Sequence, residues 1–135
     1  MILNSKIRTI KWENGVSKMI DQTLIPYEYK YVEVKTIEKM FENIKTMIVR
    51  GAPAIGIAGA HGVVLGALAL KKTEKDIKNF KNKLVEKSNW LKSATLESYE
   101  RYTKKKEKLA KAEINIKEIE IEKNQRIEEI GKEKQ

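Results

Sequence analysis

Apolar and polar residues alternate along the first part of the chain in the two-residue rhythm of β-strands. The Asn14-Gly15 pair between two such segments is a strong signal for a tight hairpin turn. A third segment at residues 29–34 is rich in β-branched and aromatic side chains, which favour strands. The pattern therefore predicts a small three-stranded antiparallel sheet over residues 7–34.

After residue 34 the apolar residues recur at the three- and four-residue intervals of helices. This spacing predicts helices near residues 36–48, 53–71 and 75–92. Thr36 suits the N-cap of the first helix, and Thr73 with an acidic residue three positions later resembles a capping box for the third. The predicted fold class is α+β, with the small sheet followed by an α-helical bundle.

Beyond residue 92 the apolar pattern loosens and charged residues dominate. We therefore expect two parts, a folded domain over residues 1–92 with strands in 7–34 and helices in 36–92, and a charged helical extension over 93–135. Asn115 is the point at which the extension divides into two helices in this interpretation. The run Lys104-Lys105-Lys106 is typical of a solvated surface.

Residues 52–70 carry no formal charge, which leaves two interpretations open from composition alone. The segment is long enough to span a bilayer, and it contains a small-residue GxxxG pattern from Gly62 to Gly66. A buried helix whose glycines admit close neighbours is the alternative. His61, in the middle of the segment, would be costly in lipid and favours the buried helix.

Charge and composition narrow the classes of function. The net charge is +9, of which +3 falls in residues 1–70 and +6 in residues 71–135. Most lysines alternate with glutamates and no aromatic residues interleave with a basic cluster, so a solvated surface is favoured over a nucleic-acid site. The chain has no cysteine and one histidine, which excludes thiolate chemistry and a histidine-cluster metal site. No secretory signal is visible, and we expect a cytoplasmic protein.

The best candidate site lies at the start of the second predicted helix. Arg50 and Gly51 precede Pro53, which suits the first turn of a helix because its missing N–H is not needed there. Free backbone N–H groups at a helix start favour an anion, and the arginine side chain adds a fork of donors that suits phosphate. His61 lies farther along the same helix, where a packed or hydrogen-bonded core histidine is the favoured interpretation.

The same segment carries a family resemblance. Residues 50–56, Arg-Gly-Ala-Pro-Ala-Ile-Gly, resemble a signature of the methylthioribose-1-phosphate isomerase family, which is related to the alpha, beta and delta subunits of initiation factor 2B. Residues 9–15 and 20–26 are similar to the opening of the isomerase branch. The resemblance covers roughly residues 8–70. It implies a soluble domain in which residues 52–70 form a central helix, with no membrane partner.

In this family the substrate is 5-methylthioribose 1-phosphate and the product its ribulose isomer, a step of methionine salvage. The resemblance implies that Arg50, Gly51 and Ala52 bind the sugar phosphate, and it implies no cofactor and no metal. A second phosphate-binding arginine of the family is absent, because Thr95 and its neighbours replace that segment. The family's catalytic cysteine and aspartate belong to a C-terminal Rossmann-like half that these residues do not resemble, so no catalytic residue is assigned.

The sequence thus predicts a truncated or degenerate isomerase that binds a sugar phosphate weakly and is inactive as this chain alone. It is a fragment, a degenerate copy or an isolated domain, partnered by a C-terminal half on a separate chain or by further copies of itself. A non-catalytic regulatory module related to the initiation-factor branch is the alternative. A basic helical nucleic-acid binder ranks below both.

Overall fold

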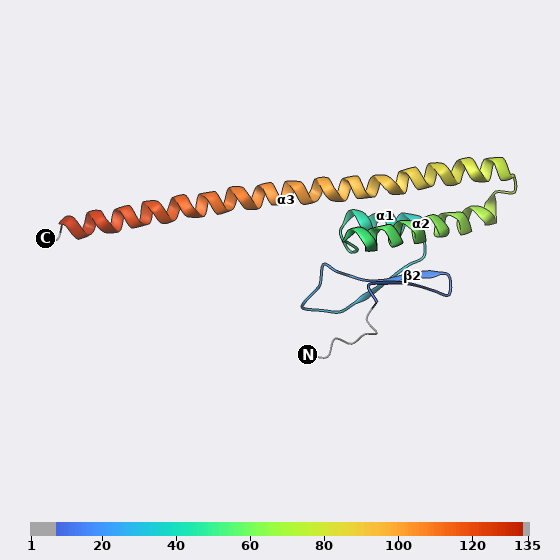
Figure 1. The fold of residues 1–135 in the computed structure, drawn as a ribbon, viewed down its shortest axis with the longest axis horizontal. Coiled ribbons are helices and arrows are strands. Elements are labelled where there is room, and N and C mark those ends of the chain that lie inside the picture. Colours follow the sequence, from blue (N-terminus) through green and yellow to red (C-terminus); the bar gives the residue numbers. More distant parts are fainter. Residues whose placement is uncertain (1–7, 134–135) are drawn as a thin grey trace. The chain divides into compact units, whose positions relative to one another are not determined.

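The computed structural model describes residues 8–133 of the chain (Figure 1). Its contacts divide the chain into two units, residues 1–98 and residues 99–135, and each is described by itself. The first unit contains three strands, two complete helices and the first part of a third helix. The second unit contains the remainder of that helix. The boundary expected at residue 92, between a family-like domain and a divergent extension, stays a prediction.

The strands are β1 (Ile10–Glu13), β2 (Val16–Ile20) and β3 (Tyr31–Val34). They form one antiparallel sheet in the order β1-β2-β3, as predicted. Asn14 and Gly15 both have positive φ angles, 51° and 78°, which is the geometry of a type I′ hairpin turn. The turn sets the register, in which Trp12 faces Ser17 across the first strand pair. The predicted start of the sheet at residue 7 lies outside the described residues.

Helix α1 (Ile37–Lys45) begins where Thr36 caps it, with the Thr36 hydroxyl accepting a hydrogen bond from the amide of Lys39 at 3.1 Å. The helix ends before the predicted residue 48. Its C-cap is Thr46, and the next residue, Met47, has a left-handed φ of 63° that a helix cannot continue.

Helix α2 (Ala52–Thr73) is the predicted second helix. Within residues 8–133 it alone is long and apolar enough to cross a membrane, although only 28% of its most apolar window is buried in the structure. The buried residues Ala58, Gly62 and Leu65 place one face of α2 in the core of the first unit. A core helix has the same composition, and the absence of a membrane partner stays a prediction.

Helix α3 (Ile77–Glu133) differs most from expectation. The predicted helix ended near residue 92 and a break was expected at Asn115, whereas the helix continues through both. Its N-terminal cap also differs from the predicted Thr73. The Asp76 carboxylate accepts a hydrogen bond from the amide of Asn79 at 2.8 Å, whereas the Thr73 hydroxyl donates to the Leu70 carbonyl of α2. Lysine, glutamate and isoleucine are compatible with helix throughout this segment, and no proline or early glycine stops it.

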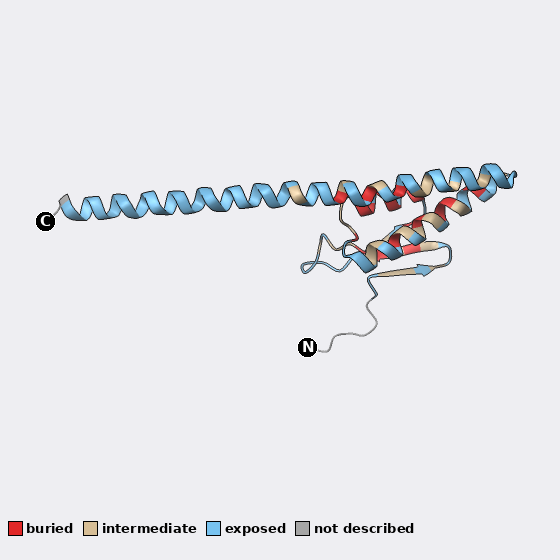
Figure 2. Cartoon of the chain, turned by 45° about the horizontal axis from the view of Figure 1, so that its top comes forward, coloured by how far each residue is buried: buried red, intermediate tan, exposed pale blue. Residues whose placement is uncertain are grey.

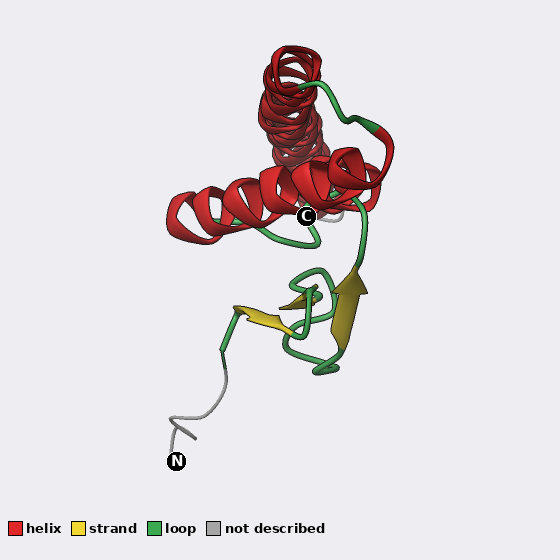
Figure 3. Ribbon diagram, turned by 90° about the vertical axis from the view of Figure 1, so that its right-hand side faces the viewer, coloured by secondary structure: helices red, strands yellow, loops and turns green. Residues whose placement is uncertain are grey.

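In the first unit the strands form one layer and the helices another (Figure 3). The residues coloured as buried in Figure 2 fall on the strands, on α1 and α2 and on the part of α3 that belongs to the first unit. The core gathers Met19 and Val34 from the sheet, and residues of all three helices belong to the same buried cluster. These helical core residues are Ile37, Met40, Phe41, Ile44, Ala58, Leu65, Leu91 and Ala94. The first unit is therefore an α+β domain with a continuous core.

Candidate functional site: a helix start beside the sheet

The segment between α1 and α2 is held in place from both sides. Val49 is fully buried in the core, and its amide donates to the Asn43 carbonyl at 3.3 Å. The carbonyl of Ile48 accepts the amide of Gln22 at 2.9 Å, which ties this segment to the chain that follows β2. Because Val49 points into the core, Arg50 stands next to it as an exposed residue at a fixed place on the backbone.

Gly51 is the N-cap of α2 and adopts a φ of 91°, a conformation that residues with a Cβ rarely enter. No side chain caps the helix there, and its first turn contains no acidic residue. Within residues 8–133 the amides of Gly51, Ala52 and Ala54 have no hydrogen-bond partner. Three unpaired N–H groups therefore lie at the positive end of a 22-residue helix, next to a guanidinium.

A hollow of about 410 Å³ opens beside this helix start. Arg50 and Gly51 line it together with Pro53 and Ala54, and the sheet side contributes Thr9, Ile20, Gln22 and Ile25. Ala52, the third predicted ligand residue, is exposed in the same helix start but does not line the hollow. The sequence pattern pointed to the helix start. It gave no signal for Thr9 and Gln22, which reach the hollow only through the packing of the sheet against α2.

His61 takes the core role that the sequence predicts. Its Nδ1 atom lies 2.8 Å from the hydroxyl of Ser17, a fully buried residue of β2. The Trp12 ring meets it edge to face at 5.2 Å between centroids. Partial burial lowers the pKa of His61 below its ordinary value, so the neutral ring is favoured. This histidine joins sheet to helix and is not a free base.

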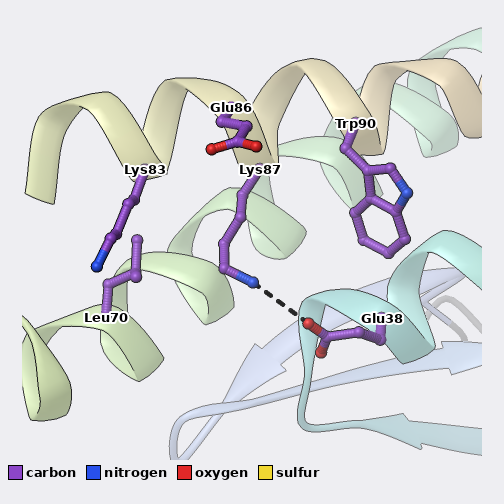
Figure 4. A pocket seen from close by; sticks show the side chains of 6 residues that line it. All are labelled: Glu38, Leu70, Lys83, Glu86, Lys87 and Trp90. Atoms are coloured by element: carbon purple, nitrogen blue, oxygen red, sulfur yellow. Dashed lines mark hydrogen bonds and ion pairs between the residues drawn. The ribbon is translucent and has the colours of Figure 1, made fainter. Parts of the chain in front are cut away.

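A second hollow, of about 370 Å³, was not predicted from the sequence (Figure 4). Its lining residues come from α1, the end of α2 and the first part of α3: Glu38, Leu70, Lys83, Glu86, Lys87 and Trp90. Lys87 and Glu38 pair across it at 3.4 Å, and Trp90 stacks on Phe41 with centroids 4.3 Å apart. Lysines and glutamates of this hollow occur in equal number, so it has no preference for an ion of either sign.

No group of three or more metal-ligating side chains occurs among the residues that the structure describes. The polar groups at the start of α2, the Arg50 side chain and the free amides, are hydrogen-bond donors, and they suit an anion. The assignment of Arg50, Gly51 and Ala52 to a phosphate stays a prediction.

Known proteins are similar to this chain in both sequence and fold. A methylthioribose-1-phosphate isomerase of Picosynechococcus sp. is 47% identical over 75 residues, 56% of this chain and 22% of that protein. A 5-deoxyribose 1-phosphate isomerase of Clostridium botulinum is 41% identical over 92 residues, 67% of this chain and 26% of that protein. No protein-family model matches the sequence.

Two solved structures support the same relationship. The 5-methylthioribose 1-phosphate isomerase of Pyrococcus horikoshii superposes with a TM-score of 0.61 and 30% identity, covering 78% of this chain and 30% of that one. The initiation factor eIF-2B subunit delta of A. fulgidus gives a TM-score of 0.58 and 34% identity over 69% of this chain and 26% of that one.

The fold defines a class that includes a sugar-phosphate isomerase and an initiation factor 2B subunit. Within it, the chain is similar in sequence and fold to part of the methylthioribose-1-phosphate isomerases. The chain spans about a quarter or less of the length of the curated relatives that it matches, with values from 18% to 26%.

Proposed function

We propose that the first unit is the phosphate-binding part of an aldose–ketose isomerase. The observation that carries this proposal is that Arg50 adjoins a helix start with three unpaired amides, those of Gly51, Ala52 and Ala54, and that Arg50, Gly51 and Ala54 line a hollow there. The two kinds of relative share a substrate class in their names, a ribose 1-phosphate altered at carbon 5. We propose 5-methylthioribose 1-phosphate as the ligand, in methionine salvage.

The chemistry of the site supports binding. A phosphate can accept two parallel N–H bonds from the arginine fork and further bonds from the free amides, while the helix dipole favours its negative charge. Each charge-assisted hydrogen bond contributes about 1.5–3 kcal/mol. The guanidinium and amides contact the phosphate from one side of an open hollow. We therefore expect dissociation constants in the millimolar range, which correspond to a binding free energy on the order of −4 kcal/mol.

Turnover needs more than binding. Moving a proton between carbons 1 and 2 of the sugar requires a positioned acid–base group. His61 is engaged by Ser17, and the 135 residues include no cysteine. We therefore propose that this chain alone binds the sugar phosphate without isomerising it. The acid–base group would be supplied by the C-terminal half of the family or by further copies of the chain. A soluble, cytoplasmic protein fits this role.

A titration of the ¹⁵N-labelled chain with ribose 1-phosphate, followed by NMR, tests the proposal. Amide shifts should cluster at residues 50–56 and weaken with added salt. Arg50→Lys, which keeps the charge and loses the fork, should reduce them, and Arg50→Ala should remove them. Lys81→Ala, an exposed cation of the same unit, is the control and should change nothing. Shifts confined to Lys104–Lys106 would instead reveal only a generic basic surface.

The similarity to the eIF-2B delta subunit supports a second candidate, a non-catalytic regulatory module that binds a partner. The two candidates differ in a simple assay. Conversion of 5-methylthioribose 1-phosphate on addition of a C-terminal half favours the isomerase. Co-purification with a partner, with no conversion in any combination, favours the regulatory module.

A further inference from the structure

The second unit presents a row of bulky apolar side chains along one face of its helix. Between residues 99 and 132, every described side chain except that of Thr103 is exposed. Six large apolar residues recur at intervals of three, seven and eight, which places them on one helical face: Tyr102, Leu109, Ile116, Ile119, Ile127 and Ile130. We call this set the apolar stripe. Each member is more than half exposed, and no other described element of the unit covers it.

The dimensions of the stripe specify the shape of what covers it. From Tyr102 to Ile130 it runs about 42 Å at 1.5 Å per residue. A narrow stripe that repeats over four heptads matches the seam of a coiled coil, whose partner is another helix with a similar seam. Lys105, Glu120 and Lys123 lie on the same face, and such polar seam positions weaken a coiled coil while restricting its register.

The distribution of charge along this helix favours a second copy of the same helix as the partner, and it favours an antiparallel arrangement of the two. Residues 99–112 contain six basic and two acidic side chains, a net charge of +4. Residues 113–133 contain four basic and seven acidic side chains, a net charge of −3. Two parallel copies would place like charge beside like charge. Two antiparallel copies place the basic half of each helix beside the acidic half of the other, which is electrostatically complementary.

We propose that residues 99–133 are a self-association helix, through which two copies of the chain form an antiparallel two-stranded coiled coil. The apolar stripe supplies the buried seam, and the opposed charge of the two halves sets the direction. The proposal is independent of sugar-phosphate binding, because the Arg50 helix start belongs to the first unit.

Analytical ultracentrifugation of the full chain tests the seam. The chain should sediment as a dimer at high micromolar concentration. Ile116→Glu with Ile119→Glu should raise the dimer dissociation constant at least tenfold. The matched control is Ile114→Glu with Ile121→Glu, two equally exposed isoleucines on the opposite face of the same helix, which should leave the dimer intact. Circular dichroism should show unchanged helix content in both variants.

A distance measurement tests the direction. Because the chain has no cysteine, Thr103→Cys provides a single site for a spin label. Antiparallel helices centred near Ile116 place the two labels about 40 Å apart, whereas parallel helices place them within about 20 Å. The proposal would be overturned if the chain were a monomer at high concentration, or if both paired variants lost the dimer equally. It would also be overturned if the dimer survived Ile116→Glu with Ile119→Glu, or if the two labels lay within the short distance. The amide shifts that ribose 1-phosphate causes at residues 50–56 should persist in every variant. Failure of the self-association proposal can therefore be distinguished from failure of the phosphate-binding proposal.

Discussion

The hydroxyl of Ser17 and the Nδ1 atom of His61 lie 2.8 Å apart and join strand β2 to helix α2. Ser17 is fully buried, and the Trp12 ring on the neighbouring strand packs against the same histidine. A neutral imidazole can accept a hydrogen bond from the serine hydroxyl at Nδ1, whereas an imidazolium would donate from Nδ1 to the serine oxygen. Protonation of His61 would therefore reverse the direction of this hydrogen bond.

The stability of the chain should fall when the solution is acidified past the ordinary pKa of histidine. Burial lowers the pKa of His61 in the folded state from its ordinary value of 6.5. As the pH falls below 6.5 the unfolded chain binds the proton first, and the free energy of unfolding decreases until the folded pKa is reached. Urea denaturation between about pH 8 and pH 5 measures this change. His61→Gln should flatten it, and an equal slope in that variant would contradict the assignment.

Removing the serine hydroxyl should weaken the same contact at neutral pH. Ser17→Ala leaves the Nδ1 atom of His61 without its partner, at a cost of about 1–2 kcal/mol in the free energy of unfolding. In the double variant Ser17→Ala/His61→Gln the two losses should be less than additive, because they share one interaction. Additive losses in a denaturation cycle would show that the hydrogen bond contributes little.

Two glycines of α2 should respond in opposite ways to alanine. A Cβ at Gly62 would lie 2.5 Å from Cδ2 of Leu91 and 3.0 Å from Cγ of Met40, so Gly62→Ala overpacks the core and should cost about 1–3 kcal/mol. A Cβ at Gly59 meets nothing within 4 Å. Gly59→Ala should therefore stabilise the helix by about 0.5–1 kcal/mol. Thermal unfolding of the two variants checks both signs, and a stable Gly62→Ala protein would argue against this close packing of α2 on α3.

Replacing Gly51 should damage the helix start itself. Gly51→Ala forces a residue with a Cβ to a φ of 91°, at a strain of about 1–3 kcal/mol, or moves the free amides out of line. The amide shifts caused by ribose 1-phosphate should become smaller although Arg50 is unchanged. The control is Gly59→Ala, a glycine of the same helix that lies outside residues 50–56 and has open space around it. Full phosphate binding by the Gly51→Ala chain would show that the guanidinium acts without the amides.

The sequence predicted those parts of the fold that local chemistry decides. Asn14-Gly15 fixed the hairpin because both residues enter the left-handed region at low cost, and Thr36 marked the start of α1. The end of α3 was missed. After residue 113 isoleucines occupy two opposite helix faces, with Ile114 and Ile121 on one and Ile116 and Ile119 on the other, so the spacing no longer resembles one amphipathic helix.

The candidate site was predictable only in part for a similar reason. Arg50, Gly51 and Pro53 are neighbours in sequence, and their chemistry at a helix start can be recognised without a structure. Thr9, Gln22 and Ile25 reach the hollow through long-range contacts, including the bond between Gln22 and the Ile48 carbonyl. The burial of Ser17 beside His61 likewise depends on the packing of β2 on α2, which periodicity does not specify.

Because Val49 is buried next to the exposed Arg50, a phosphate bound at Arg50 would be linked to the stability of the fold. A phosphate held by Arg50 and the amide of Gly51 can stay bound only while the neighbouring valine remains in the core. By linkage, a sugar phosphate present at ten times its dissociation constant should stabilise the folded chain by about 1.4 kcal/mol. Even a weakly bound sugar phosphate would then protect the chain from thermal unfolding and proteolysis whenever the concentration of the sugar phosphate in the cell rises.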